Sequence, residues 1–210
     1  MTVHAVPAAE HAVGAVRSAG RWCLVAGLLG AASGIWLAVV TPQVADVRYS
    51  YPLDSGAFTA IQVFFFVQHL GLLAGIVGLG RSGAVGSSRA GHWGVVAASG
   101  GMLLLTATEL LAITAADSPY PGPGTGLLDA LYGISSLATG AGLVVAGVAV
   151  LRARRWQGPR RWAPVAVGAY VFVPMTPLLF GPFVLARLAI VGWMLLFSVL
   201  GAALLHAELR

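Results

Sequence analysis

The sequence predicts an all-α membrane protein, a six-transmembrane-helix bundle with its N and C termini in the cytoplasm. Two features of composition predict the membrane. Hydrophobic residues make up 58% of the 210 residues and charged residues only 9%, whereas soluble domains average roughly 25% charged residues. A soluble fold could not cover such a core with so little polar surface. The third observation, the distribution of arginines along the chain, predicts the orientation.

Six segments are apolar over the roughly 20 residues that a helix needs to cross a bilayer. They are 22–41, 58–80, 93–116, 126–151, 162–180 and 183–206. Residues 1–20 are expected to form a cytoplasmic N-terminal arm, 21–206 the transmembrane domain and 207–210 a C-terminal tail. The first segment is too long for the apolar region of a cleavable signal peptide.

The boundary between the fifth and sixth segments is the least defined. Only Gly181 and Pro182 interrupt the apolar sequence there, so a re-entrant pair or one long broken helix remains an alternative to two full spans. Pro174 and Pro177 are expected to kink or break the outer half of the fifth span, because proline lacks the backbone N–H that a helix interior needs.

All 12 basic residues are arginine, and ten of them fall on one side of the predicted bundle. Cytoplasmic loops carry an arginine excess, which places both termini inside. Only Arg48 and Arg187 fall on the outer side. The inner set is Arg17, Arg21, Arg81, Arg89, Arg152, Arg154, Arg155, Arg160, Arg161 and Arg210. We attribute the basic sequence pI of about 10.1 to this topology and not to nucleic-acid binding.

Three spans open with a similar motif, "RWCLVA", "HWGVVA" and "RWAPVA", whose tryptophans are Trp22, Trp93 and Trp162. One interpretation is three related helical hairpins. The other, which we favour, is that tryptophan beside a basic residue marks the inner membrane interface of any span.

Polar side chains gather in the outer half of four predicted spans. Glu109 lies roughly 10 Å below the outer end of its span, at 1.5 Å per residue. Tyr132 follows Asp129 by three residues on one helix face, and Arg187 falls in the first turns of the last span. The candidate polar pocket comprises Glu109, Arg187, Asp129, Tyr132, His69 and Gln62.

A charge facing lipid is costly, so Glu109 is expected to face the bundle interior with Arg187 as its partner by depth. The functional interpretation is a pocket, open to the outside, for a small solute or a proton. The structural interpretation is a polar clamp between helices, with Arg187 reaching the headgroups. His69 alone is more typical of a core histidine, and Thr139 of a hydroxyl bonded within its own helix.

Several functions lack the residues that they need. The chain has no lysine for a retinal Schiff base and a single cysteine, Cys23. A bis-histidine haem needs two histidines at one depth, whereas His92 and His206 are predicted at the inner edge. "GISS", ending at Ser136, lacks the last glycine of the rhomboid protease motif, and His206 lies at the wrong face for its catalytic base. We therefore predict no catalytic residue, metal or cofactor.

In its general sequence character, carried by the stretches "RYSYPLDSGAF" and "YVFVPMTPLLFGPFVLARLAIVGWMLLF", the chain resembles the small polytopic integral membrane proteins of high-GC actinobacteria. The resemblance covers most of its length. The resemblance implies a fold type and no activity.

The function expected from the sequence is a small-solute or proton-linked carrier or sensor that uses the outer pocket. The alternative is a non-catalytic membrane scaffold or a regulatory subunit of a partner protein. An enzyme ranks third, because no pairing of a nucleophile with a base is visible. Expected partners are the lipid bilayer of the plasma membrane and either a small solute or a membrane protein, and no nucleic acid.

Overall fold

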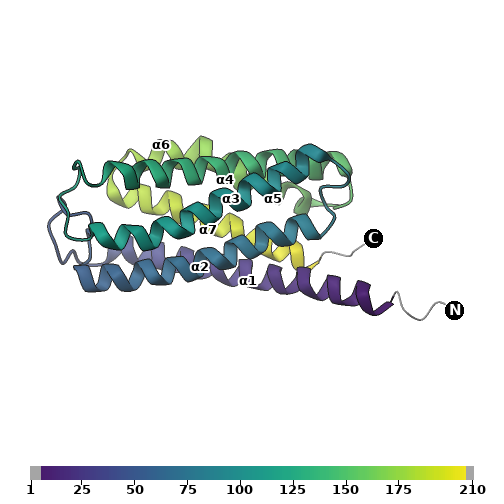
Figure 1. Ribbon diagram of the computed structural model, residues 1–210, viewed down its shortest axis with the longest axis horizontal. Helices are drawn as coiled ribbons and strands as arrows, with labels where there is room; N and C mark the ends of the chain where they lie inside the picture. The colour runs from purple at the N-terminus through teal and green to yellow at the C-terminus, as the bar shows by residue number, and fades with distance from the viewer. Residues whose placement is uncertain (1–5, 207–210) are drawn as a thin grey trace.

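The computed structural model describes residues 6–206, with side chains from residue 10, and consists of long helices lying side by side (Figure 1). The helices are α1 (Val6–Val39), α2 (Ser55–Arg81), α3 (Arg89–Ala112), α4 (Gly126–Ala153), α5 (Ala163–Tyr170), α6 (Thr176–Leu179) and α7 (Phe183–Leu205). Within the described residues, six helical segments are long and apolar enough to cross a membrane. The prediction of six spans is thus confirmed, and the chain is a multi-pass membrane protein by length and composition.

The fifth and sixth spans are two separate helical segments. The fifth span is continuous from a 3-10 turn (η2, Pro159–Trp162) through α5, a π-helical turn (η3, Val171–Met175) and α6. Pro174 lies inside the π turn, and the hydroxyl of Thr176 donates to the Val171 carbonyl at 2.6 Å. The expected interruption by proline therefore takes the form of one wide turn. Gly181 and Pro182 then separate this span from α7.

The spans close into a ring in chain order. Each of α1 to α4 packs against the next helix, α5 packs against α7, and α7 packs against α1. Within the described residues, α2 and α7 also touch across the ring, whereas α3 and α7 make no helix–helix contact. This order decides which polar side chains can meet.

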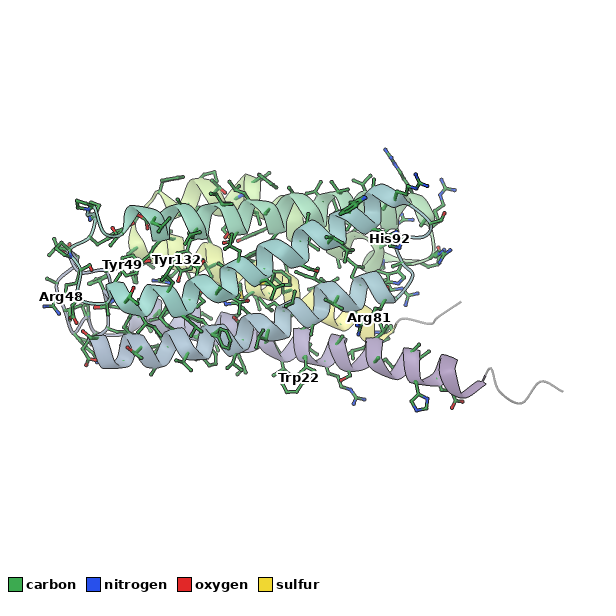
Figure 2. The ribbon with its side chains drawn as sticks, viewed as in Figure 1. Trp22, Arg48, Tyr49, Arg81, His92 and Tyr132 are labelled. Carbon is green, nitrogen blue, oxygen red and sulfur yellow. The ribbon has the colours of Figure 1, made fainter. Side chains whose placement is uncertain are left out.

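The two ends of the bundle differ in composition. We call one the arginine-rich end: it holds the 82–88 and 154–158 connections and the end of α7, with Arg81 and His92 nearby (Figure 2). The other, the tyrosine end, holds the 40–54, 116–125 and 180–182 connections, with Arg48 and Tyr49. Arg48 Nη1 lies 2.7 Å from Asp117 Oδ1 and so ties two of these connections together.

Local sequence explains where two of the helices begin. Asp54 precedes α2, and its carboxylate accepts from the Ala57 amide at 2.8 Å. Ser88 precedes α3 and accepts from the Gly91 amide at 3.1 Å. Both are N-cap residues that satisfy an otherwise unpaired helix N–H.

Glycine lets neighbouring helices approach closely. A Cβ added to Gly142 on α4 would lie 2.5 Å from the Gly94 carbonyl oxygen on α3, and one on Gly201 of α7 would lie 2.7 Å from the Gly20 oxygen on α1. The pairs α3/α4 and α1/α7 thus pack backbone against backbone. Two other glycines face side chains of neighbouring helices, with Gly75 against Cys23 and Gly34 against Val191.

Large apolar side chains cover the outside of the bundle. Val67, Leu127 and Val173 are 59%, 66% and 73% exposed, a surface that suits lipid and not water. Trp22, Trp93 and Trp162 also point outward, at 63%, 71% and 52% exposure. This orientation agrees with tryptophans that sit at a membrane interface.

The first helix begins well before the predicted span. Residues 6–20, which the sequence analysis set apart as part of an arm, continue α1 without a break. Ala15 faces Arg81, the last residue of α2, across a shallow cleft. The nine residues before Ala15 therefore extend about 14 Å past the end of α2, at 1.5 Å per residue, as Figure 1 shows for the purple helix. Residues 1–5 and the predicted tail, 207–210, lie outside the described residues.

Candidate functional site

Glu109 lies at the centre of a buried polar cluster formed by α2, α3 and α4. Its Oε2 accepts hydrogen bonds from Gln62 Nε2 at 2.9 Å and from the Tyr132 hydroxyl at 2.7 Å. Gln62 Nε2 also lies 3.1 Å from the Tyr132 oxygen. Its distance to the Glu109 backbone carbonyl oxygen is 3.2 Å. Glu109 and Gln62 are only 5% and 4% exposed, so the carboxylate is held by protein groups and not by water.

Helix direction explains why these side chains meet. In a helix the Cα–Cβ bonds tilt toward the N-terminus. The N-termini of α2 and α4 are at the tyrosine end, so Gln62 and Tyr132 lean toward that end. The N-terminus of α3 is at the arginine-rich end, so Glu109 leans the other way, deeper into the bundle. Because α3 packs between α2 and α4, the three side chains converge.

His69 lies on the deeper side of Glu109. Its Nδ1 is 3.6 Å from Glu109 Oε1 and 2.7 Å from the Phe65 carbonyl oxygen, and the residue is 6% exposed. A carbonyl oxygen can only accept, so Nδ1 carries a hydrogen and donates it to Phe65. In the neutral ring Nε2 then has a free lone pair. Glu109 Oε1 accepts no hydrogen bond from the described residues. Each of these two side chains thus has an atom that can take up a proton.

Arg187 shares the layer of Glu109 but does not form an ion pair with it. Among the described residues, Arg48 and Asp117, and His69 and Glu109, are the pairs in ion-pair contact. Arg187 as a whole is half-buried, and its guanidinium carbon lies 5.0 Å from the centre of the Phe183 ring one turn earlier on α7. Because α7 and α3 are not neighbours in the ring, equal depth does not bring the two charges into contact. The sequence-based choice of Arg187 as the partner of Glu109 is replaced by Gln62, Tyr132 and His69.

Asp129 is separate from the cluster. It lies in the first turn of α4, and its side chain is exposed. A carboxylate in the first turn of a helix is stabilised by the positive end of the helix dipole. This interaction accounts for Asp129 without a role in the cluster. Of the six predicted pocket residues, the structure therefore brings together Glu109, Gln62, Tyr132 and His69 and leaves Arg187 and Asp129 outside hydrogen-bonding distance.

A small apolar cluster separates Glu109 from the tyrosine end. Its buried members are Leu37, Leu53, Phe58, Ala112 and Ala116, and Tyr49 and Tyr132 pack against it. Tyr49 forms edge contacts with Phe58 and Tyr120, with ring centres 6.0 and 5.6 Å apart. Burial, and then the charge of Asp129, raise the pKa of the Tyr49 phenol above its usual value. Tyr49 therefore keeps its hydroxyl proton while it helps to close this end of the bundle (Figure 2).

Sequence reasoning missed two residues around the site. Gln68 is 5% exposed, and its amide donates to the Ala26 carbonyl at 2.9 Å, which ties α2 to α1. The sequence feature that could have identified Gln68 is a second amide side chain in the apolar stretch "FFFVQHLG", next to His69. Tyr49 was visible only as one of several tyrosines in an outer loop. The interpretation of Thr139 is confirmed, because its hydroxyl donates to Ser135 on its own helix at 2.8 Å.

The cluster contains one carboxylate, one imidazole, one amide and one phenol. Among residues 6–206, no three side chains of His, Cys, Asp or Glu lie close enough together to hold a metal ion. The groups present suit the binding and release of protons and hydrogen bonding to a small polar solute. No protein-family model, curated protein or solved structure matches this chain.

Proposed function

We propose that the chain is a plasma-membrane protein with its arginine-rich end, and hence both termini, in the cytoplasm. The support is the charge distribution. Nine of the inner arginines named above lie within the described residues, whereas Arg48 and Arg187 lie toward the tyrosine end. Arginine near the ends of spans is retained on the cytoplasmic side.

Reporter fusions test this orientation. A reporter that works only in the cytoplasm should be active when it is fused after Arg155. A reporter that works only outside the cytoplasm should be active when it is fused after Gly122, because these residues lie in connections at opposite ends. Paired reporters that each work in one compartment, read in intact cells, provide the measurement. The opposite pattern would reverse the proposed orientation.

We further propose that the protein is a proton-linked carrier or sensor, with Glu109 as its proton-binding residue. The observation that carries this proposal is the open Oε1 of a buried carboxylate beside a histidine with a free ring nitrogen. Acids and histidines inside a membrane protein commonly mark proton pathways, because burying them there is costly. In this scheme Gln62 and Tyr132 hold Oε2, which leaves Oε1 and His69 Nε2 as two atoms that can each take up a proton.

The same arrangement gives a route for coupling to conformation. When Glu109 takes up a proton on Oε1, the charge that Gln62 and Tyr132 stabilise disappears, and both hydrogen bonds to Oε2 weaken. These bonds join α3 to α2 and α4. Protonation is therefore expected to loosen α3 from its two neighbours near the tyrosine end, where access to the cluster is closed.

Infrared spectroscopy tests the proton-binding role directly. In the full chain reconstituted in lipid nanodiscs, carboxylic acid C=O absorption should grow as pH falls, and the component due to Glu109 should be missing in Glu109→Gln. Asp129→Asn, which removes an exposed acid from α4, should leave this band in place. His69→Gln should shift its titration, because the imidazole lies against Oε1.

Proteoliposomes with an internal pH dye provide the second readout. A carrier should move protons under an imposed gradient, and Glu109→Gln should abolish the flux. A sensor should show no flux but a pH-dependent change in the environment of Tyr132 that Glu109→Gln removes. Both the carrier and the sensor would be contradicted if Glu109 kept one protonation state over the whole pH range in which the protein is folded and no proton flux were measured.

The second candidate is a non-catalytic scaffold or regulatory subunit. The observation that favours it is the low exposure of the cluster: Glu109, Gln62 and His69 are all at most 6% exposed, and Oε2 has two partners. A polar clamp of this kind fixes the register of three helices. In that case the lipid-facing surface would bind the partner, and Glu109→Gln would affect assembly and not proton uptake.

A further inference from the structure

A cleft at the arginine-rich end has the size and lining of a ligand site. Its volume is about 520 Å³, within the usual range for small-molecule sites. It lies between the 82–88 connection, the first turn of α3 and the last turns of α4. The cleft is far from Glu109, which lies near the other end of α3.

One wall of the cleft is apolar and open to the membrane. It consists of Val144, Val145 and Val148 on α4, with Ala90 on α3 opposite. Val145 is 43% exposed. An acyl chain from the surrounding bilayer can lie along this wall without crossing any polar group.

The rim of the cleft is basic. Arg152 and Arg155 both line it, together with Ser87 and Ser88, and none of the described lining residues is acidic. Arg155 is fixed in place, because its Nη1 donates to the Gly83 carbonyl at 3.0 Å. Its remaining N–H groups stay available. Arg152 follows Val148 by four residues and so lies directly beyond it on the same helix face.

Backbone geometry keeps the rim compact. Gly83 and Gly86 have φ values of 70° and 64°, which most other residues avoid. A Cβ at Gly86 would lie 3.0 Å from the Ala153 side chain at the end of α4. The connection between α2 and α3 thus packs against the end of α4 and brings its serines beside the two arginines.

We propose that this cleft binds one anionic phospholipid, with its phosphate on Arg152 and Arg155 and one acyl chain along Val144, Val145 and Val148. Arginine forms strong, directional hydrogen bonds to phosphate, and the hydroxyl of Ser87 adds a donor. Free phosphate would use the rim alone, whereas a lipid also uses the apolar wall. The proposal is independent of the role of Glu109; with the orientation proposed above, the lipid belongs to the cytoplasmic leaflet.

Native mass spectrometry of the purified full chain, with either phosphatidylglycerol or phosphatidylcholine added to the detergent, tests the proposal. We expect phosphatidylglycerol to bind more tightly, and Arg152→Gln with Arg155→Gln to weaken it about 25-fold, since each arginine near an anionic surface contributes about fivefold. The control is Arg21→Gln with Arg154→Gln. It removes the same charge at the same end, from exposed residues that do not line the cleft. It should change affinity less than about twofold.

A third variant separates lipid from free phosphate. Val145→Trp fills the apolar wall from its exposed side and leaves both arginines, so it should weaken phosphatidylglycerol binding without changing the thermal unfolding midpoint. Equal losses in the two double variants would show diffuse attraction and no site. Unchanged phosphatidylglycerol binding by Val145→Trp would show that a lipid is not the ligand. Competition by inorganic phosphate that is as strong as competition by phosphatidylglycerol would show the same. No preference over phosphatidylcholine would also overturn the proposal.

Discussion

Gly142→Ala is expected to destabilise the protein strongly, whereas Gly133→Ala on the same helix is not. The added Cβ at Gly142 would overlap the Ala98 backbone nitrogen and lie 2.5 Å from the Gly94 oxygen, both on α3. Backbone atoms cannot move aside as a flexible side chain can, so α3 and α4 must separate. At Gly133 a Cβ meets nothing within 4 Å.

The comparison isolates packing. Both substitutions replace glycine by alanine inside α4 and so gain the same helix propensity. The difference in their free energies of unfolding is then the cost of overpacking, about 1–3 kcal/mol, with the upper part expected because both contacted atoms belong to the backbone. Unfolding by a denaturing detergent in mixed micelles, followed by circular dichroism, gives both values. Equal stability of the two variants would mean that α3 and α4 do not approach this closely.

Gln62→Leu is expected to have the second large effect. It removes the donor to Glu109 Oε2 and to the Glu109 carbonyl and leaves a buried acid with fewer partners. A buried hydrogen bond to a charged group contributes about 1.5–3 kcal/mol, which is the expected loss. Adding Glu109→Leu should recover part of this loss, because the buried acid that lost its donor is then gone and the Tyr132 hydroxyl is the polar group left unpaired. The same unfolding measurement, applied to all four proteins of the cycle, gives the coupling between the two residues.

Arg187 provides the matched comparison. The sequence alone suggests that Arg187→Met should recover stability lost in Glu109→Gln. The structure leads us to expect a weaker coupling than that between Gln62 and Glu109, because no ion pair joins Arg187 to Glu109. If the coupling between Arg187 and Glu109 were as large as that between Gln62 and Glu109, the ion pair predicted from depth would be supported after all.

The depth of each polar residue could be predicted from the sequence, but its direction around the bundle could not. Span limits follow from local hydropathy, and counting residues from those limits placed Gln62, Glu109, Tyr132 and Arg187 in one layer. Only the order of helices in the ring decides which of them touch. Nothing near Arg187 in the sequence shows that α7 lies beside α1 and α5 and not beside α3.

Gln68 and Val6 illustrate two further limits. Gln68 follows Gln62 by six residues, which turns it away from Glu109 toward α1 and α7, where its partners are a distant carbonyl and the sulfur of Met194. Those partners are separated from it by 42 and 126 residues. The start of α1 at Val6 was missed because hydropathy marks the membrane and not the helix. The alanine-rich residues 8–20 favour helix whether or not lipid surrounds them.

The extension of α1 past α2 has a mechanical consequence. A continuous helix is a stiff rod, and this one has an arm of nine residues on one side of Ala15 and the membrane-crossing portion on the other. A sideways force on the arm becomes a tilt of the whole rod about the point where the bundle grips it. Gly20 and Gly27 lie just beyond that point, against α7, so a tilt would be felt first where the two backbones touch. The arm is thus the short end of a lever whose long end lies in the bundle.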